Sequence, residues 1–176
     1  SGFSTVSLTE GGIYDFIHCT MANSWEYSFR SEPVMFIGKG AGALPEVTVV
    51  NTVITGTLNN ELFIDAVPSE VSGRFIADSS LIKVDTTGSD WYVSGLFKDV
   101  QTTPLPRYID ESAYDYRPDT LSPLLDIAGR SEAVSWSRDI RNMPRPTGAG
   151  PDIGAYERQP GEKKQAAGNR GASVKK

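Results

Sequence analysis

The chain has 176 residues, of which 39% are hydrophobic and 22% charged, values typical of a folded globular protein and not of a disordered one. The formal net charge of -5 is unevenly distributed, because the stretch from Arg158 to Lys176 carries six basic residues and one acid, which leaves the rest strongly acidic. The acidic body argues against nucleic acid as a partner, and the absence of a long apolar run argues against a membrane span.

Short segments rich in β-branched and aromatic residues follow one another along the chain and predict strands. They cover residues 14–21, 47–55, 74–84 and 91–97, and each is bounded by Gly, Asn, Asp or Pro. A helical pattern is weak throughout. Residues 131–138 are the best candidate, and they predict at most a turn or two of helix.

Internal similarity links three of these segments. Residues 17–23 align with residues 50–56, and residues 78–83 fit the same frame, so that His18, Asn51 and Ser79 occupy one column. Repeats of this length with conserved strands and variable loops are typical of a parallel β-solenoid. Asparagines at the inner bend of such coils can form hydrogen-bonded ladders. An antiparallel β-sandwich with strands of chance similarity is the alternative.

Three blocks near the C-terminus carry a resemblance to a known family. Residues 122–129 read SPLLDIAG, residues 139–146 read DIRNMPRP, and residues 152–157 read DIGAYE. In this order and spacing, they resemble the closing signature of choice-of-anchor Q domain proteins. The chain departs from the family by one extra residue within 126–129, and by Asn142 where a Gly is usual. Asn tolerates a positive φ better than most residues, so it suits the same turn.

The resemblance implies an all-β, right-handed parallel β-helix of the pectin-lyase-like type with an irregular, loop-rich C-terminal cap. We therefore expect β-helix coils over residues 1–100, a capping segment over 101–157 and a disordered basic tail over 158–176. The resemblance also implies an extracellular or cell-surface location. Because few coils can be counted, we expect that further coils of a longer parent chain precede this segment.

Five charged residues of the closing blocks are the expected structural cap site: Asp126, Asp139, Arg145, Asp152 and Glu157. Arg145 is expected to bridge the carboxylates of Asp126, Asp139 or Asp152 and so to hold the loops over the terminal coil. Exposed, solvated charges are one alternative. A calcium site that begins with Asp139 and Asp152 is the other, although no calcium-binding loop motif supports it, and no other cofactor is expected.

The sequence identifies no catalytic residue. His18 is the single histidine and has no partner at a catalytic spacing, so it is expected to face outward from a strand, while Cys19 is expected to be a plain buried thiol. Charged residues that could serve glycoside cleavage or lyase chemistry are too numerous to rank. The chain is therefore not established as an enzyme.

Aromatic pairs are the expected ligand-binding residues: Trp25 with Tyr27, and Trp91 with Tyr92. Such rings form flat platforms on which sugar rings stack, and burial against loops is the alternative. The function expected is a non-catalytic extracellular β-helix segment, adhesin-like or glycan-binding, whose partner is a polysaccharide or cell-surface glycan. The alternatives are the C-terminal part of a β-helix polysaccharide lyase or glycoside hydrolase whose active coils lie upstream, and a purely structural end cap.

Overall fold

The computed structural model describes residues 3–24, 29–87 and 95–162, and strands dominate these ranges. The strands are β1 (Val6–Leu8), β2 (Ile13–Ile17), β3 (Thr20–Asn23), β4 (Met35–Gly38), β5 (Glu46–Val50), β6 (Val53–Gly56), β7 (Leu62–Asp65), β8 (Phe75–Asp78), β9 (Leu81–Ile82), β10 (Phe97–Lys98), β11 (Tyr108–Asp110) and β12 (Asp115–Pro118). The helices are short: α1 (Pro68–Val71), the 3₁₀ turn η1 (Glu111–Ala113) and α2 (Arg130–Ser135). In the described part of the chain, no helix has the length and apolar character that a membrane crossing needs.

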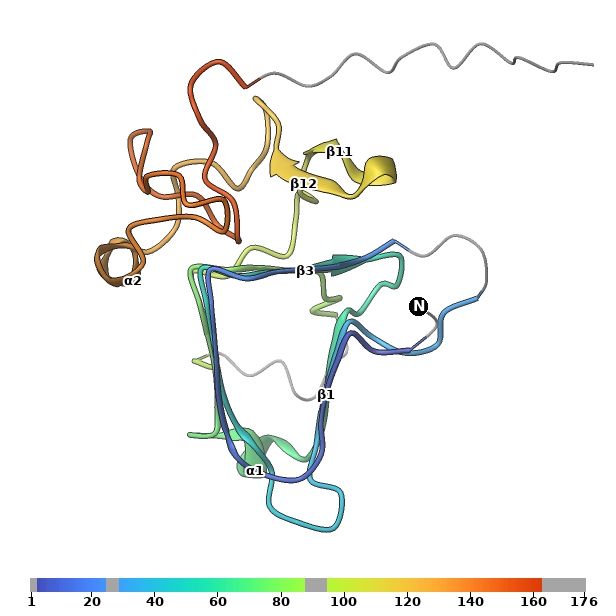
Figure 1. Ribbon diagram of the computed structural model, residues 1–176. Helices are drawn as coiled ribbons and strands as arrows, with labels where there is room; N and C mark the ends of the chain where they lie inside the picture. The colour runs from blue at the N-terminus through green and yellow to red at the C-terminus, as the bar shows by residue number, and fades with distance from the viewer. Residues whose placement is uncertain (1–2, 25–28, 88–94, 163–176) are drawn as a thin grey trace, which may run out of the picture.

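Three parallel sheets contain all strands except β11 and β12, which form an antiparallel hairpin. Their orders are β1-β4-β7, β2-β5-β8-β10 and β3-β6-β9, so the chain returns to each of the three sheets with every third strand as far as β9. In Figure 1, successive passes of the chain lie over one another and the three sheets border a common interior. The protein is therefore all-β with parallel pairing, and the antiparallel sandwich considered from the sequence is wrong.

The strand register confirms the alignment of the internal repeats. Ile17 pairs with Val50 and Val50 pairs with Asp78 in one sheet, while Thr20 pairs with Val53 and Val53 with Leu81 in the next. These are the columns that the sequence comparison predicts. Polar and apolar positions repeat because stacked strands must present the same alternation to one interior.

Each predicted strand that contains a copy of the repeat is in fact two strands, joined by a two-residue corner whose first residue has a left-handed backbone. His18, Asn51, Ser79 and Asp99 have φ between 46° and 51°, and each turns the chain from the second sheet toward the third. The predicted outward orientation of His18 is wrong, because His18 occupies this corner and is buried. Asp99 extends the column to a fourth pass that the sequence comparison missed. Cys19, in contrast, is only partly buried.

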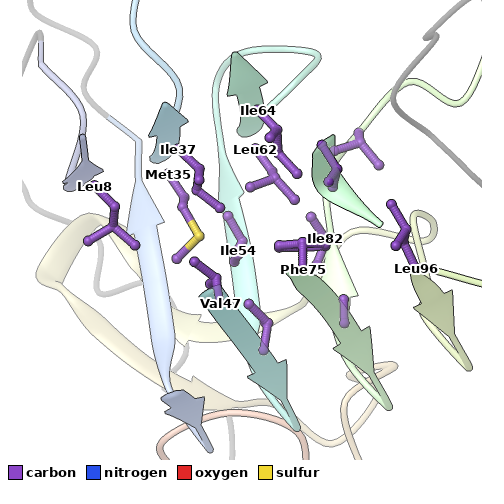
Figure 2. Close-up of a cluster of buried hydrophobic side chains, with 14 of the residues drawn as sticks. Leu8, Met35, Ile37, Val47, Ile54, Leu62, Ile64, Phe75, Ile82 and Leu96 are labelled. Atoms are coloured by element: carbon purple, nitrogen blue, oxygen red, sulfur yellow. The ribbon is translucent and has the colours of Figure 1, made fainter. Parts of the chain in front are cut away.

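The main core lies between the three sheets, where alternate side chains of each strand point inward (Figure 2). Leu62 from the first sheet, Val49 from the second and Ile82 from the third have no exposed surface. Burial of an aliphatic side chain of this size stabilises the fold by about 1.5–3 kcal/mol. The core therefore links the sheets that the chain visits in turn.

The β3-β6-β9 sheet is apolar on its outward face as well. Val53 and Leu81 are fully buried there, although they alternate with the inward-facing Ile54 and Ile82. They pack against Tyr108, Leu124, Ala128 and Ile153 of the later chain. A sheet that is apolar on both faces needs a cover on each, and residues 101–162 supply the outer one.

The position of this cover corrects the expectation that residues 101–157 close the end of the last coil. In Figure 1 the segment lies outside the outline of the three sheets, beside β3. Its contacts reach the first strand of that sheet, since the backbone N–H of Ala155 donates a 3.0 Å hydrogen bond to Thr20 Oγ1. A lid on the last coil would meet only the last strand. We call residues 119–162, which follow the hairpin, the flank segment.

Candidate functional site

The aromatic residues predicted to bind a ligand, Trp25, Tyr27, Trp91 and Tyr92, lie outside the described residues. The charged residues predicted to form the cap site all lie in the flank segment. Asp126, Asp139, Arg145, Asp152 and Glu157 come from three loops, and hydrogen bonds join these loops to one another.

Arg145 is buried, and its ion-pair partner differs from those expected. Its Nε donates to Glu157 Oε2 at 3.2 Å, and one of its terminal nitrogens donates to the backbone oxygen of Gly154 at 2.9 Å. Both side chains of the pair are 1% exposed. Asp126, Asp139 and Asp152, the partners suggested from the sequence, bind backbone N–H groups instead. The sequence named Glu157 as a site residue without assigning it to Arg145.

Glu157 organises the chain on both sides of it. Its carboxylate accepts hydrogen bonds from the backbone N–H groups of Thr147 and Asp152, each at 2.9 Å, in addition to the bond from Arg145. A buried carboxylate with a guanidinium and two backbone donors has most of its acceptor capacity satisfied. The arrangement is structural, because the oxygens that a substrate would approach are already engaged.

Asp139 plays a similar role in the turn that ends in Asn142. The Asp139 carboxylate accepts from the backbone N–H groups of Arg141, Met143 and Glu157 and from the Arg141 guanidinium. Burial by itself would raise the pKa of Asp139, but the donors outweigh burial and the pKa is lowered. Asn142 has a φ of 64°, the conformation for which the family resemblance suggested that Asn could replace Gly.

Asp152 is buried and joins the first closing block to the last. One carboxylate oxygen accepts from the backbone N–H of Asp126 at 2.8 Å, and the other from that of Arg158 at 2.7 Å. Burial raises the pKa of Asp152 to about 6, and nearby Glu157 and Asp126 contribute to the rise, against the opposing effect of the two N–H donors. The Asp126 carboxylate in turn accepts from Gly150 N at 3.0 Å.

Calcium binding by Asp139 and Asp152 is not favoured by this geometry. Both carboxylates face backbone N–H donors, whereas calcium takes six to eight oxygen ligands. Among the described residues, no three or more His, Cys, Asp or Glu side chains gather as metal ligands would.

The flank segment is attached to the sheets at the corner formed by His18 and Asn51, where the chain turns from the second sheet to the third. Asn51 Oδ1 accepts from Gly129 N at 2.6 Å, and Asn51 Nδ2 donates to Gly129 O at 3.0 Å and lies 3.1 Å from His18 Nε2. The backbone oxygen of Asn51 also accepts from Gly154 N at 2.8 Å. The Asn51 column, which the sequence suggested as a ladder within the coils, thus also binds the flank segment.

A second buried ion pair, Arg30 with Glu61, has no signal in the sequence that reveals it. Both terminal nitrogens of Arg30 donate to the Glu61 carboxylate at 2.8 Å, and both side chains are almost fully buried. Glu61 also accepts from Val34 N and Leu58 N. A Cβ on Gly56 would collide with this pair, so the pair fits only because residue 56 is glycine.

Of the aromatic pairs among the described residues, Phe36 with Phe63 lies on the outward face of the β1-β4-β7 sheet. Phe36 and Phe63 pair in register, and their ring centroids are 5.9 Å apart with planes 18° from parallel. The sequence carries a signal for this pair, because Leu62–Asp65 repeats the pattern of Met35–Gly38 with Phe at the same position. Neither segment was among the strands predicted from the sequence.

Comparisons of the chain with protein-family models, with curated proteins and with solved structures give no match.

Proposed function

We propose that the three parallel sheets are the sides of a right-handed parallel β-helix, in which each circuit of the chain forms one coil. The cyclic order of the sheets and the matched register of successive strands support this architecture. The three closing blocks support it further. They resemble those of choice-of-anchor Q domain proteins, and hydrogen bonds such as Asp126 N to Asp152 Oδ1 join two of them.

Within this architecture, residues 1–100 are the coils and residues 101–162 a stabilising cover. The cover extends past the expected boundary at 157, because Arg158 N donates to Asp152 Oδ2 at 2.7 Å and Glu162 pairs with Arg117 and Arg141. The expected tail over 158–176 is therefore wrong for residues 158–162. The cover acts on the flank of one sheet and not on the end of the stack. Its buried charges serve this attachment, as the bonds of Glu157 to Arg145 and to two backbone N–H groups indicate. Coils of a longer parent chain would extend the same three sheets.

The function we propose is non-catalytic glycan binding by an adhesin-like β-helix segment at the cell surface or outside the cell. The observation that carries it is the pair Phe36 and Phe63, which presents aromatic surface outward from a regular sheet. Flat apolar rings of this kind suit the apolar faces of sugars. The buried charged residues favour binding over catalysis, because Arg30, Glu61, Arg145 and Glu157 are occupied by one another.

A glycan array probed with the 176-residue chain tests this function, together with an absorbance assay for unsaturated products of uronate cleavage. We expect binding to at least one glycan class and no product from any of them. Release of unsaturated products would instead favour the lyase alternative. An array without any bound glycan would rule out the glycan-binding function.

A further inference from the structure

Phe36 and Phe63 project from neighbouring strands to the outside of the β1-β4-β7 sheet. Their sequence neighbours Met35, Ile37 and Leu62 are buried in the core, so alternation along the strands directs both rings outward. Rings superposed face to face would lie about 3.5–4.0 Å apart. At a centroid distance of 5.9 Å the two nearly parallel rings are therefore offset, and part of each face stays uncovered.

The backbone beneath the Phe36 ring leaves room for it. A Cβ built on Gly38 would lie 2.9 Å from Cε1 and 3.2 Å from Cζ of Phe36, so the Phe36 ring extends along the strand over this glycine. Residue 38 must stay without a side chain for the ring to hold that position. The two rings thus form a low apolar strip along the sheet surface.

A carboxylate borders this strip. Asp65 pairs with Gly38 in the strand register, is exposed, and follows Phe63 by two residues, so it projects from the same face. Carboxylates accept hydrogen bonds from sugar hydroxyls, while rings bind the apolar C–H face of a pyranose. Asp65 and the acidic body both repel a polymer of uronic acids.

From this arrangement we propose that Phe36, Phe63 and Asp65 form a subsite for neutral pyranose units of an extended glycan. The inference rests on the proposed glycan-binding function and specifies its site and ligand class. Two aromatic positions one strand apart contact successive sugar units, and Asp65 selects uncharged chains. An aromatic cross-strand pair also stabilises the sheet itself, so binding and folding must be measured separately.

The test is affinity electrophoresis of the full chain in native gels that contain hydroxyethylcellulose, galactomannan or polygalacturonate. The variants are Phe36→Ala and Phe63→Ala. Ile76→Ala is the matched control, because Ile76 and Phe63 are each 43% exposed and Ile76 lies on β8 of another sheet. Urea unfolding of each variant shows whether it is folded under the conditions of the gel.

We expect one or both neutral polymers to retard the chain, and each Phe variant to weaken this binding about tenfold, the effect of losing one aromatic contact with a sugar ring. Ile76→Ala should bind within a factor of two of the unchanged chain. If a Phe variant is unfolded, Phe36→Leu and Phe63→Leu, which keep the apolar volume, replace it and should show the same loss.

Three results would overturn the subsite. Equal binding by the folded Phe variants and the unchanged chain would remove these residues from the binding surface, while the glycan-binding function would stand. Tighter binding to polygalacturonate than to either neutral polymer would contradict the ligand class. No retardation of the unchanged chain in any gel would count against the proposed function, and the subsite would fall with it.

Discussion

Asn51 and Gly129 form a closed pair of hydrogen bonds, in which the Asn51 side-chain amide both accepts from the Gly129 N–H and donates to the Gly129 carbonyl. The pair joins residues 78 positions apart in the chain. It also lies at a corner where Asn51 has a φ of 50°. One side chain therefore serves both the turn between two sheets and the attachment of the flank segment.

Replacing Asn51 with Gly is expected to separate these two roles. Gly accepts the positive φ but removes the buried Asn51 amide and leaves the partly buried Gly129 N–H and C=O without their partner, which should lower the free energy of unfolding by about 2–4 kcal/mol. Urea denaturation measures the change. The exposed Asn59→Gly is the control and should differ by less than about 0.5 kcal/mol. Equal stability of Asn51→Gly and Asn59→Gly would mean that the flank segment is not bound through this amide.

The buried ion pair of Arg145 with Glu157 leads to a second prediction. Arg145→Ala leaves the Glu157 carboxylate buried without its counter-charge, and a loss of about 3–5 kcal/mol in the free energy of unfolding is expected. Adding Glu157→Gln to this variant should restore part of the loss, because the remaining group is neutral.

The control for this experiment is Lys39→Ala, which removes the exposed pair of Lys39 with Glu70, whose side chains are 50% and 40% exposed. Solvent screens such pairs, so no measurable loss is expected. The prediction fails if Arg145→Ala and Lys39→Ala give similar denaturation midpoints.

A third prediction concerns pH. Burial raises the pKa of Asp152 from 3.8 to about 6, so the folded protein holds this proton at pH values where the unfolded chain has released it. The stability due to the neutral carboxyl is complete below pH 3.8 and is lost as the pH rises through about 6. The loss amounts to at most about 3 kcal/mol.

Asp152→Asn cannot ionise, and it should remove this decline between pH 4 and pH 6. The measurement is the slope of unfolding free energy against pH, which is insensitive to a constant loss from a changed hydrogen bond. Asp139 and Glu162, whose pKa values are lowered, act in the opposite sense, from about pH 4.5 downward, and do so equally in both proteins. Parallel pH profiles for the two proteins would contradict the raised pKa.

Gly154, in the last closing block, leads to a fourth prediction. It has a φ of 104°, and a Cβ at this position would lie 2.7 Å from Thr20 Oγ1. Gly154→Ala combines backbone strain with a steric conflict, and a loss of roughly 2–4 kcal/mol is expected. Gly73→Ala is the control, since Gly73 has a φ of 76° and no atom within 4 Å of the added Cβ. The excess loss at Gly154 over Gly73 measures the contact with β3.

The alternation of polar and apolar residues was enough to predict the pairing of Ile17 with Val50 and of Val50 with Asp78, because stacked strands repeat one local pattern. It could not reveal the bends at His18 and Ser79, whereas the bend at Asn51 agrees with the inner bend that the sequence suggested for asparagines. Neither His nor Ser is a residue type that predicts a positive φ, and the surrounding sheets impose this conformation. Residues with high strand propensity lie on both sides of each bend, so the sequence predicted one strand where the structure has two.

The contacts between residues far apart in the chain could not be predicted from the sequence for a related reason. Several carboxylates of the closing blocks lie near Arg145 in the chain, and the loop geometry alone decides that Glu157 reaches it. The position of the flank segment depends likewise on the outward apolar face at Val53 and Leu81. The alternation of polar and apolar residues assigned one face of β6 and β9 to the interior, but it did not show what covers the other face. Whether Trp25, Tyr27, Trp91 and Tyr92 bind a ligand remains a prediction.

The hydrogen bond between Ala155 and Thr20 joins residues 135 positions apart. During synthesis, the early strands can therefore associate with one another well before their outer cover has left the ribosome. Until then Val53 and Leu81 face water on one side, and closing so long a loop carries a large entropic penalty. The nascent chain thus passes through a stage in which the outward apolar face of this sheet is exposed. At that stage, chaperone binding or self-association competes with folding of the cover onto the sheet.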